Sequence, residues 1–83
     1  MTLHQEDRVY QTVCALTSAR AIVSALDAHK AAYGIAPGVV QTLTTSVNAL
    51  MLDAIGNDHE LRWDHEVTRA RDLLQHALKE LVR

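Results

Sequence analysis

The chain has 83 residues, a net charge of −2 with neutral histidines, and a hydrophobic fraction of 48%. Ten acids against eight bases leave no positive excess for nucleic acid or an anionic membrane surface, so neither is expected as a partner. The apolar content, with three glycines and one proline, is typical of a folded helical domain and excludes a disordered chain.

The size of the chain limits its core. A domain this small buries only about 60% of its unfolded surface, so disulfides, metals or oligomerisation usually supplement the core. Cys14 is the only cysteine, which excludes an internal disulfide. No apolar run approaches the ~18 residues of a membrane span, and the N-terminus has no signal-peptide pattern, so we expect a soluble cytoplasmic protein.

The first predicted helix spans residues 3–33. Thr2 and Gln5 have capping-box spacing, and Gly34 suits the left-handed residue that closes a helix. A heptad pattern places two rows on its inner side, with Val13 and Ile22 beside them. The rows are Val9, Leu16, Val23 and Lys30, and Thr12, Ala19, Leu26 and Tyr33.

The opposite side of this helix carries a second set of residues, all small except the first. They fall within about 60° of each other at ~100° per residue. The set is Tyr10, Cys14, Ala21, Ala25, Ala28 and Ala32. Two interpretations stay open. Alanine favours helices and such a face can be solvated, or the small side chains permit a close contact between helices of two subunits.

The second predicted helix, residues 37–55, is the most apolar stretch of the chain. Pro37 suits the first helical position and Gly56 the residue just past the end. Its apolar arc is wide, which indicates contact with more than one neighbour. The arc comprises Val40, Leu43, Val47, Leu50 and Ala54, widened by Val39, Met51, Leu52 and Ile55.

The third predicted helix spans residues 58–82. Asn57 and Glu60 have capping-box spacing before it. An apolar stripe follows at spacings of three and four: Trp63, Val67, Ala70, Leu74, Ala77 and Leu81. Trp63 is interpreted as ordinary core or, alternatively, as the anchor of a contact with a partner protein.

These elements predict an all-α fold in one domain, residues 1–83, with three antiparallel helices joined by short links. The middle helix is too short to cover both neighbours, which would overhang it by about 10–15 Å. A second copy of the chain is the simplest cover for the overhanging apolar stripes, so we expect a homodimeric helical bundle.

Chemistry-bearing residues form no convergent site in the sequence pattern. His59 and His65 would lie about 120° from a shared face on one helix, and Cys14 lies mid-helix without a histidine one turn away. The polar cluster around Trp63 mixes residues that point in different directions. We therefore expect no enzyme activity, no cofactor and no metal.

The expected function is a small protein–protein interaction module, acting as an adaptor, anti-activator or inhibitor. Its partners would be a second copy of itself and an unknown protein, through the small-residue face of the first helix or through Trp63. One alternative is a DNA-binding transcriptional regulator, since Arg69, Arg71, Lys79 and Arg83 make the third helix mildly basic. The other is a purely structural helical dimer.

Overall fold

The computed structural model describes residues 3–83, with side chains from residue 6 onward, and every element in this part of the chain is an α-helix. α1 spans Leu3–Tyr33, α2 Pro37–Ile55, α3 His59–Trp63 and α4 His65–Val82. The all-α fold class is thus confirmed. The predicted capping box of Thr2 and Gln5 lies outside the residues whose side chains are described.

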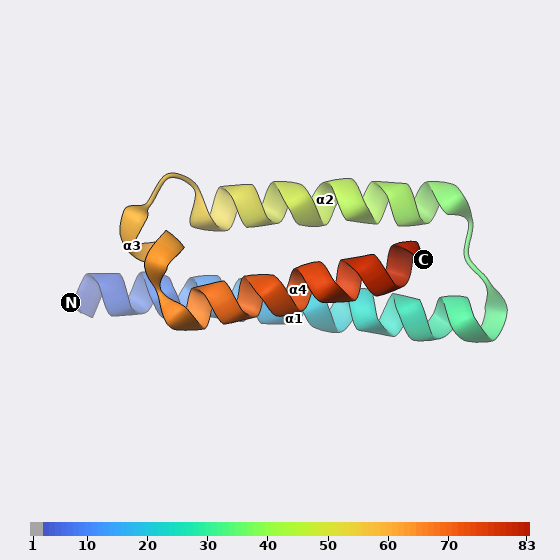
Figure 1. The fold of residues 1–83 in the computed structure, drawn as a ribbon, viewed down its shortest axis with the longest axis horizontal. Coiled ribbons are helices and arrows are strands. Elements are labelled where there is room, and N and C mark those ends of the chain that lie inside the picture. Colours follow the sequence, from blue (N-terminus) through green and yellow to red (C-terminus); the bar gives the residue numbers. More distant parts are fainter. Residues whose placement is uncertain (1–2) are drawn as a thin grey trace.

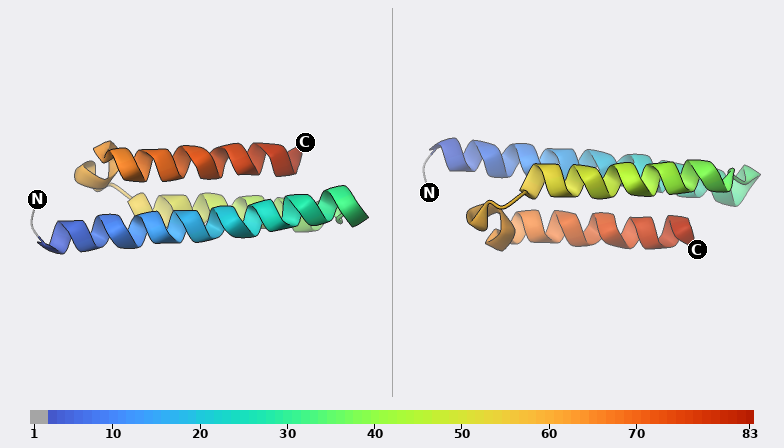
Figure 2. Two further views of the ribbon diagram at one scale, coloured as in Figure 1. Left: turned by 90° about the horizontal axis from the view of Figure 1, so that it is seen from below. Right: turned by 90° about the horizontal axis from the view of Figure 1, so that it is seen from above.

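The three long helices lie side by side along the long axis of the molecule, which measures 47 × 18 × 15 Å (Figure 1, Figure 2). In Figure 1, α1 runs from left to right, α2 returns, and α4 runs from left to right again. Gly34 (φ +80°) and Gly56 (φ +55°) end α1 and α2, and each donates its N–H at 2.8 Å, to the carbonyls of Lys30 and Leu52. A positive φ is costly for side chains with a Cβ, which is why glycine occupies both positions.

The core lies along the seam between α1 and α4, which pack together more closely than either packs against α2. Leu16 and Val23 of α1 and Leu74 and Leu81 of α4 are completely inaccessible to solvent. Most of the predicted inner rows of α1 are in this seam. The other buried members are Val9, Thr12 and Ala19, while Leu26 is half-buried.

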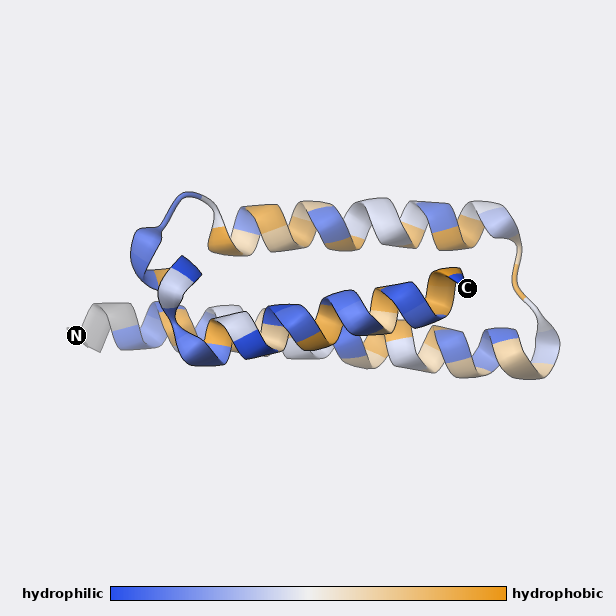
Figure 3. Ribbon diagram, in the orientation of Figure 1, coloured by the Kyte–Doolittle hydropathy of each residue, from blue (hydrophilic) through white to orange (hydrophobic). Residues whose placement is uncertain are grey.

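α2 is the least buried of the long helices. Of the nine residues of its predicted apolar arc, only Val47 and Met51 are buried, and Leu52 is 76% exposed. α2 contacts both α1 and α4, but these two helices cover only part of an arc this wide. Figure 3 shows the contrast: apolar colours spread along α2, whereas α4 shows its apolar and polar faces in turn.

The third predicted helix is in fact two helices, so the prediction of one continuous helix over residues 58–82 is wrong. Asp64 takes an extended conformation (φ −70°, ψ 131°) and its carboxylate accepts hydrogen bonds from the N–H groups of Glu66 (2.9 Å) and Val67 (3.0 Å). Asp58, rather than Asn57, caps α3, because its carboxylate accepts from Glu60 (3.0 Å) and Leu61 (3.1 Å). Two aspartate caps in succession interrupt the helix.

Packing explains the interruption. Leu61 and Val67 are both buried, at 2% and 1% exposure. On one continuous helix, six residues would separate them by about 120°, and they would not share an inward face. Trp63, four residues before Val67, would share that face instead. After the break Trp63 is 81% exposed, so its interpretation as core of this chain is wrong.

Lys30 ties the end of α1 to the end of α4. Its Nζ donates to the backbone carbonyls of Leu81 and Arg83, both at 2.7 Å. A cation at this position satisfies carbonyls that the last helical turn leaves unpaired and complements the helix dipole. Tyr33 lies almost one turn beyond Lys30, past the end of α4, and is 82% exposed. Its predicted place in the core is therefore wrong.

Candidate interaction surfaces

The outward face of α1 comprises Tyr10, Cys14, Ala21, Ala25, Ala28 and Ala32, and every one of these residues is exposed. Tyr10 is 71% exposed, and Cys14 is a free thiol on the surface. Because the core seam occupies the other side of the helix, the small residues lie together on the solvent side. The face extends for about 33 Å at 1.5 Å per residue.

α1 also has few charges. The segment Glu6–Tyr33 is long and apolar enough to cross a membrane by length and composition, and it is the one such helix among the residues that the structure describes. No membrane span was predicted from the sequence. Between residues 9 and 26 the only charged side chain is Arg20, and 28% of the most apolar window is buried within the molecule. Core helices meet the same criterion, but much of this helix is uncovered.

The junction of α3 and α4, which we call the elbow, forms a hollow of about 530 Å³. Its lining residues are His59, Arg62, Trp63, His65, Thr68 and Arg71. The break at Asp64 brings His59 and His65 to one hollow, which a continuous helix would not do. Asp58 and Asp64, which belong to the polar cluster around Trp63 in the sequence, do not enter the hollow's lining but cap α3 and α4. Trp63 thus lies at the surface beside basic side chains.

A short repeat in the sequence indicates the elbow, although the prediction of one continuous helix over residues 58–82 did not use it. Asp-His-Glu followed by an apolar residue occurs at 58–61 and again at 64–67. In both copies the aspartate caps a helix and the apolar residue is buried. An aspartate whose carboxylate can accept hydrogen bonds from the N–H groups two and three residues later is a recognisable signal for the start of a helix.

The two arginines of the elbow differ in their surroundings. Arg62 is exposed. Arg71 pairs with Asp72 through Nη2 at 3.2 Å, but its Nε is buried and makes no hydrogen bond within the described part of the chain. An unsatisfied buried donor is energetically costly.

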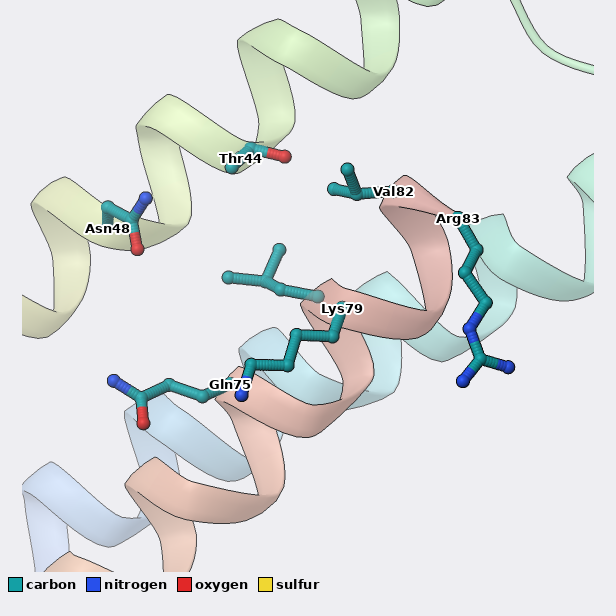
Figure 4. Close-up of a pocket in the computed structure, with 7 residues that line it drawn as sticks. Thr44, Asn48, Gln75, Lys79, Val82 and Arg83 are labelled. Atoms are coloured by element: carbon teal, nitrogen blue, oxygen red, sulfur yellow. The ribbon is translucent and has the colours of Figure 1, made fainter.

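A groove runs from the elbow along the space between α2 and α4. Its larger part, about 600 Å³, is lined by Thr44, Asn48, Gln75, Leu78, Lys79, Val82 and Arg83. Figure 4 shows Thr44 and Asn48 pointing from α2 toward α4, and Val82 pointing back toward α2. A smaller part of about 240 Å³ shares Asn48 and Gln75 with the larger part, and Arg62 and Arg71 with the elbow hollow. The rest of its lining is Met51, Leu52, Ile55 and Gly56.

An ion pair between Arg8 of α1 and Asp58 joins the start of α3 to the rest of the molecule. The hydrogen bond from the Leu61 N–H, together with the positive charge of Arg8, holds the pKa of Asp58 below its usual 3.8. The carboxylate thus caps α3 and binds α1 at the same time. Protonation would weaken both contacts.

The remaining chemistry-bearing side chains lie apart. Among the side chains that the structure describes, those of residues 6–83, no three histidine, cysteine, aspartate or glutamate groups lie closely enough together to hold a metal ion. His29 lies against Tyr33, with ring centroids 5.1 Å apart, and His76 lies 3.9 Å from Glu80. These contacts connect neighbouring turns of one helix.

Comparisons with protein-family models, with curated proteins and with solved structures find no match for this chain. The outward face of α1, the elbow and the α2–α4 groove are therefore the features from which a function is inferred.

Proposed function

We propose that this chain is a small helical interaction module that self-associates as a homodimer and acts by occupying the surface of a partner protein. In this assembly α1, α2 and α4 form an antiparallel three-helix protomer. Two protomers would pack through the outward face of α1. The observation that carries the proposal is the exposure of that entire face, opposite the core seam.

The chemistry of the outward face supports a helix–helix contact. The distance between packed helices is about 8–10 Å and depends on the side chains at the contact, so alanines permit the closest approach. Tyr10 adds a large apolar side chain that is 71% exposed in the protomer. A chain of 83 residues with one cysteine also gains from burying further apolar surface in a dimer.

A charge on the outward face tests the proposal. We expect Ala25→Glu to weaken the dimer by about 2 kcal/mol or more, because a charge buried without a partner is costly. Ala31→Glu is the matched control, since Ala31 is also exposed on α1 but lies about 120° around the helix from Ala25. It should change the dimer by no more than about 0.5 kcal/mol. Sedimentation equilibrium of both variants and the wild type measures the dissociation constant of each dimer.

The single thiol provides an independent readout. If Cys14 lies in the dimer interface, alkylation should slow as the protein concentration rises, and Ala25→Glu should remove this dependence. A wild type that remains monomeric at high concentration contradicts self-association. Equal weakening by Ala25→Glu and Ala31→Glu contradicts the choice of face.

The apolar character of Glu6–Tyr33 requires a membrane control. In a dimer through α1, the protein should stay in solution when it is mixed with vesicles of neutral or anionic lipid. Co-flotation of the wild type with either kind of vesicle would instead assign the outward face of α1 to a lipid surface and contradict the proposal.

A further inference from the structure

The α2–α4 groove, together with the elbow hollow, is lined by cations although the chain is acidic. Arg62, Arg71, Lys79 and Arg83, four of the chain's eight lysine and arginine residues, line it. In the part of the chain that the structure describes, none of the ten acids of the sequence is among the lining residues.

Two of these cations have a carboxylate beside the groove. Arg71 pairs with Asp72 at 3.2 Å, and Arg83 pairs with Glu80 at 3.5 Å. Each of the four side chains is more than one-third exposed, and ion pairs at the surface are weak, so each pair can exchange for a carboxylate of a ligand. The groove is therefore electrostatically unbalanced and open to an anionic partner.

The floor of the same groove is apolar. Met51 and Leu78 form buried parts of it, while Leu52 and Val82 are 76% and 56% exposed. α2 contributes the apolar arc that α1 and α4 leave partly uncovered. An occupant must therefore supply apolar side chains for the floor and carboxylates for the cations.

We propose that the α2–α4 groove binds an acidic amphipathic helix of the partner protein, which packs as a fourth long helix against α2 and α4. This proposal rests on the proposed function of the chain as an interaction module. α4 has 18 residues, so the groove accommodates a helix of about 27 Å. Along α4, Arg71, Lys79 and Arg83 lie about 12 Å and then about 6 Å apart, and acids at similar spacings on the ligand match them. Trp63, at the elbow end, provides an exposed aromatic anchor.

The groove fits a protein helix better than it fits a phosphate backbone. A helix start with free N–H groups is one kind of phosphate site, and α4 does not offer it, because Asp64 already accepts from the N–H groups of Glu66 and Val67. The apolar floor also has no counterpart in a phosphate chain. Carboxylates on a helix satisfy the guanidinium groups through paired hydrogen bonds while the apolar stripe covers the floor.

A designed peptide tests the proposal with the intact protein. The probe is a synthetic helix of about 20 residues with a leucine stripe, no tryptophan, and glutamates on one flank at the spacings of the cations. Trp63 is the only tryptophan, so its fluorescence reports binding at the elbow end. We expect the glutamate peptide to bind, with an affinity that falls as salt rises, and a lysine version to bind at least about tenfold more weakly.

Paired charge reversals locate the binding site. The groove variant combines Arg62→Glu with Lys79→Glu, and the control combines Arg20→Glu with Arg69→Glu outside the groove. All four residues are exposed, and each variant changes the net charge from −2 to −6. The groove variant should lose at least about tenfold in affinity for the glutamate peptide, and the control less than about twofold. Helicity and thermal unfolding establish that both variants are folded.

Several outcomes overturn the proposal. The first is no binding of the glutamate peptide at low salt, and the second is equal weakening by both variants. The third is equal binding of the glutamate and lysine peptides, a comparison that uses the wild type alone.

Binding of duplex DNA that the groove variant abolishes would assign the groove to nucleic acid. Loss of the homodimer in the groove variant would assign the groove to a second copy. If the protein forms a dimer that Ala25→Glu weakens but does not bind the peptide, the proposed groove site is wrong while the proposed self-association stands.

Discussion

The α1–α4 seam and α2 show that hydrophobicity and burial are separate properties of a helix. α2 is the most apolar helix by sequence, yet only two of its 19 residues are buried. α4 carries many charges, yet five of its 18 residues are buried. α4 collects its apolar residues in one narrow stripe that is covered mainly by α1, whereas α2 spreads them over an arc that needs more neighbours.

This difference divides the molecule into a stabilising part and a less covered part, where we propose that a partner binds. The seam holds the residues with no access to solvent and the contacts of Lys30 at its end. The incompletely covered arc of α2 forms one wall of the groove. Substitutions in the two regions should therefore have different effects on folding, from large in the seam to small elsewhere.

The largest expected effect is in the seam. We expect Leu74→Ala to lower the free energy of unfolding by about 2–5 kcal/mol, because Leu74 is fully buried and its truncation leaves a cavity. Leu52→Ala on α2 is the matched control and should change it by about 0.5 kcal/mol or less, since Leu52 is 76% exposed. Urea unfolding measures both. Similar losses for the two variants would contradict the division between seam and α2.

A smaller effect is expected at the end of the seam. Lys30→Met keeps the apolar stem but removes both hydrogen bonds to the carbonyls at the end of α4. We expect a loss of about 1–2 kcal/mol and faster amide exchange in the last turn of α4. Lys79→Met, at an exposed lysine on α4, should cost about 0.5 kcal/mol or less. Unchanged exchange at the end of α4 in Lys30→Met would show that the seam does not depend on this cap.

The smallest effect is expected at the partly exposed contact of Asp58 with α1. Because the pKa of Asp58 is lowered in the folded protein, its stabilisation is present above its usual value of 3.8 and is lost as the pH falls through the lower folded value. We expect thermal stability to fall less steeply below about pH 4 in Asp58→Asn than in the wild type, since asparagine still caps but does not titrate. If the thermal stabilities of the two proteins fall in parallel across this pH range, the acid-dependent loss does not come from Asp58.

Part of the candidate site could be predicted from the sequence. The outward face of α1 follows from the periodicity of one uninterrupted helix, and each of its residues lies on the solvent side. The elbow and the groove could not be predicted from periodicity. They depend on the break at Asp64, and a stripe that extends from Trp63 to Leu81 conceals that break. The repeated Asp-His-Glu pattern was the one local signal for it.

The local sequence is sufficient to predict the helical class and the ends of α1 and α2, because Gly34, Pro37 and Gly56 act through their own backbone preferences. It also determined which side of α1 faces the core. Contacts between helices, in contrast, leave Trp63 exposed, place Lys30 at the end of α4 and leave α2 loosely covered. These outcomes depend on which helix ends meet and how much of an apolar arc two neighbours cover, and a pattern within one segment does not contain that geometry.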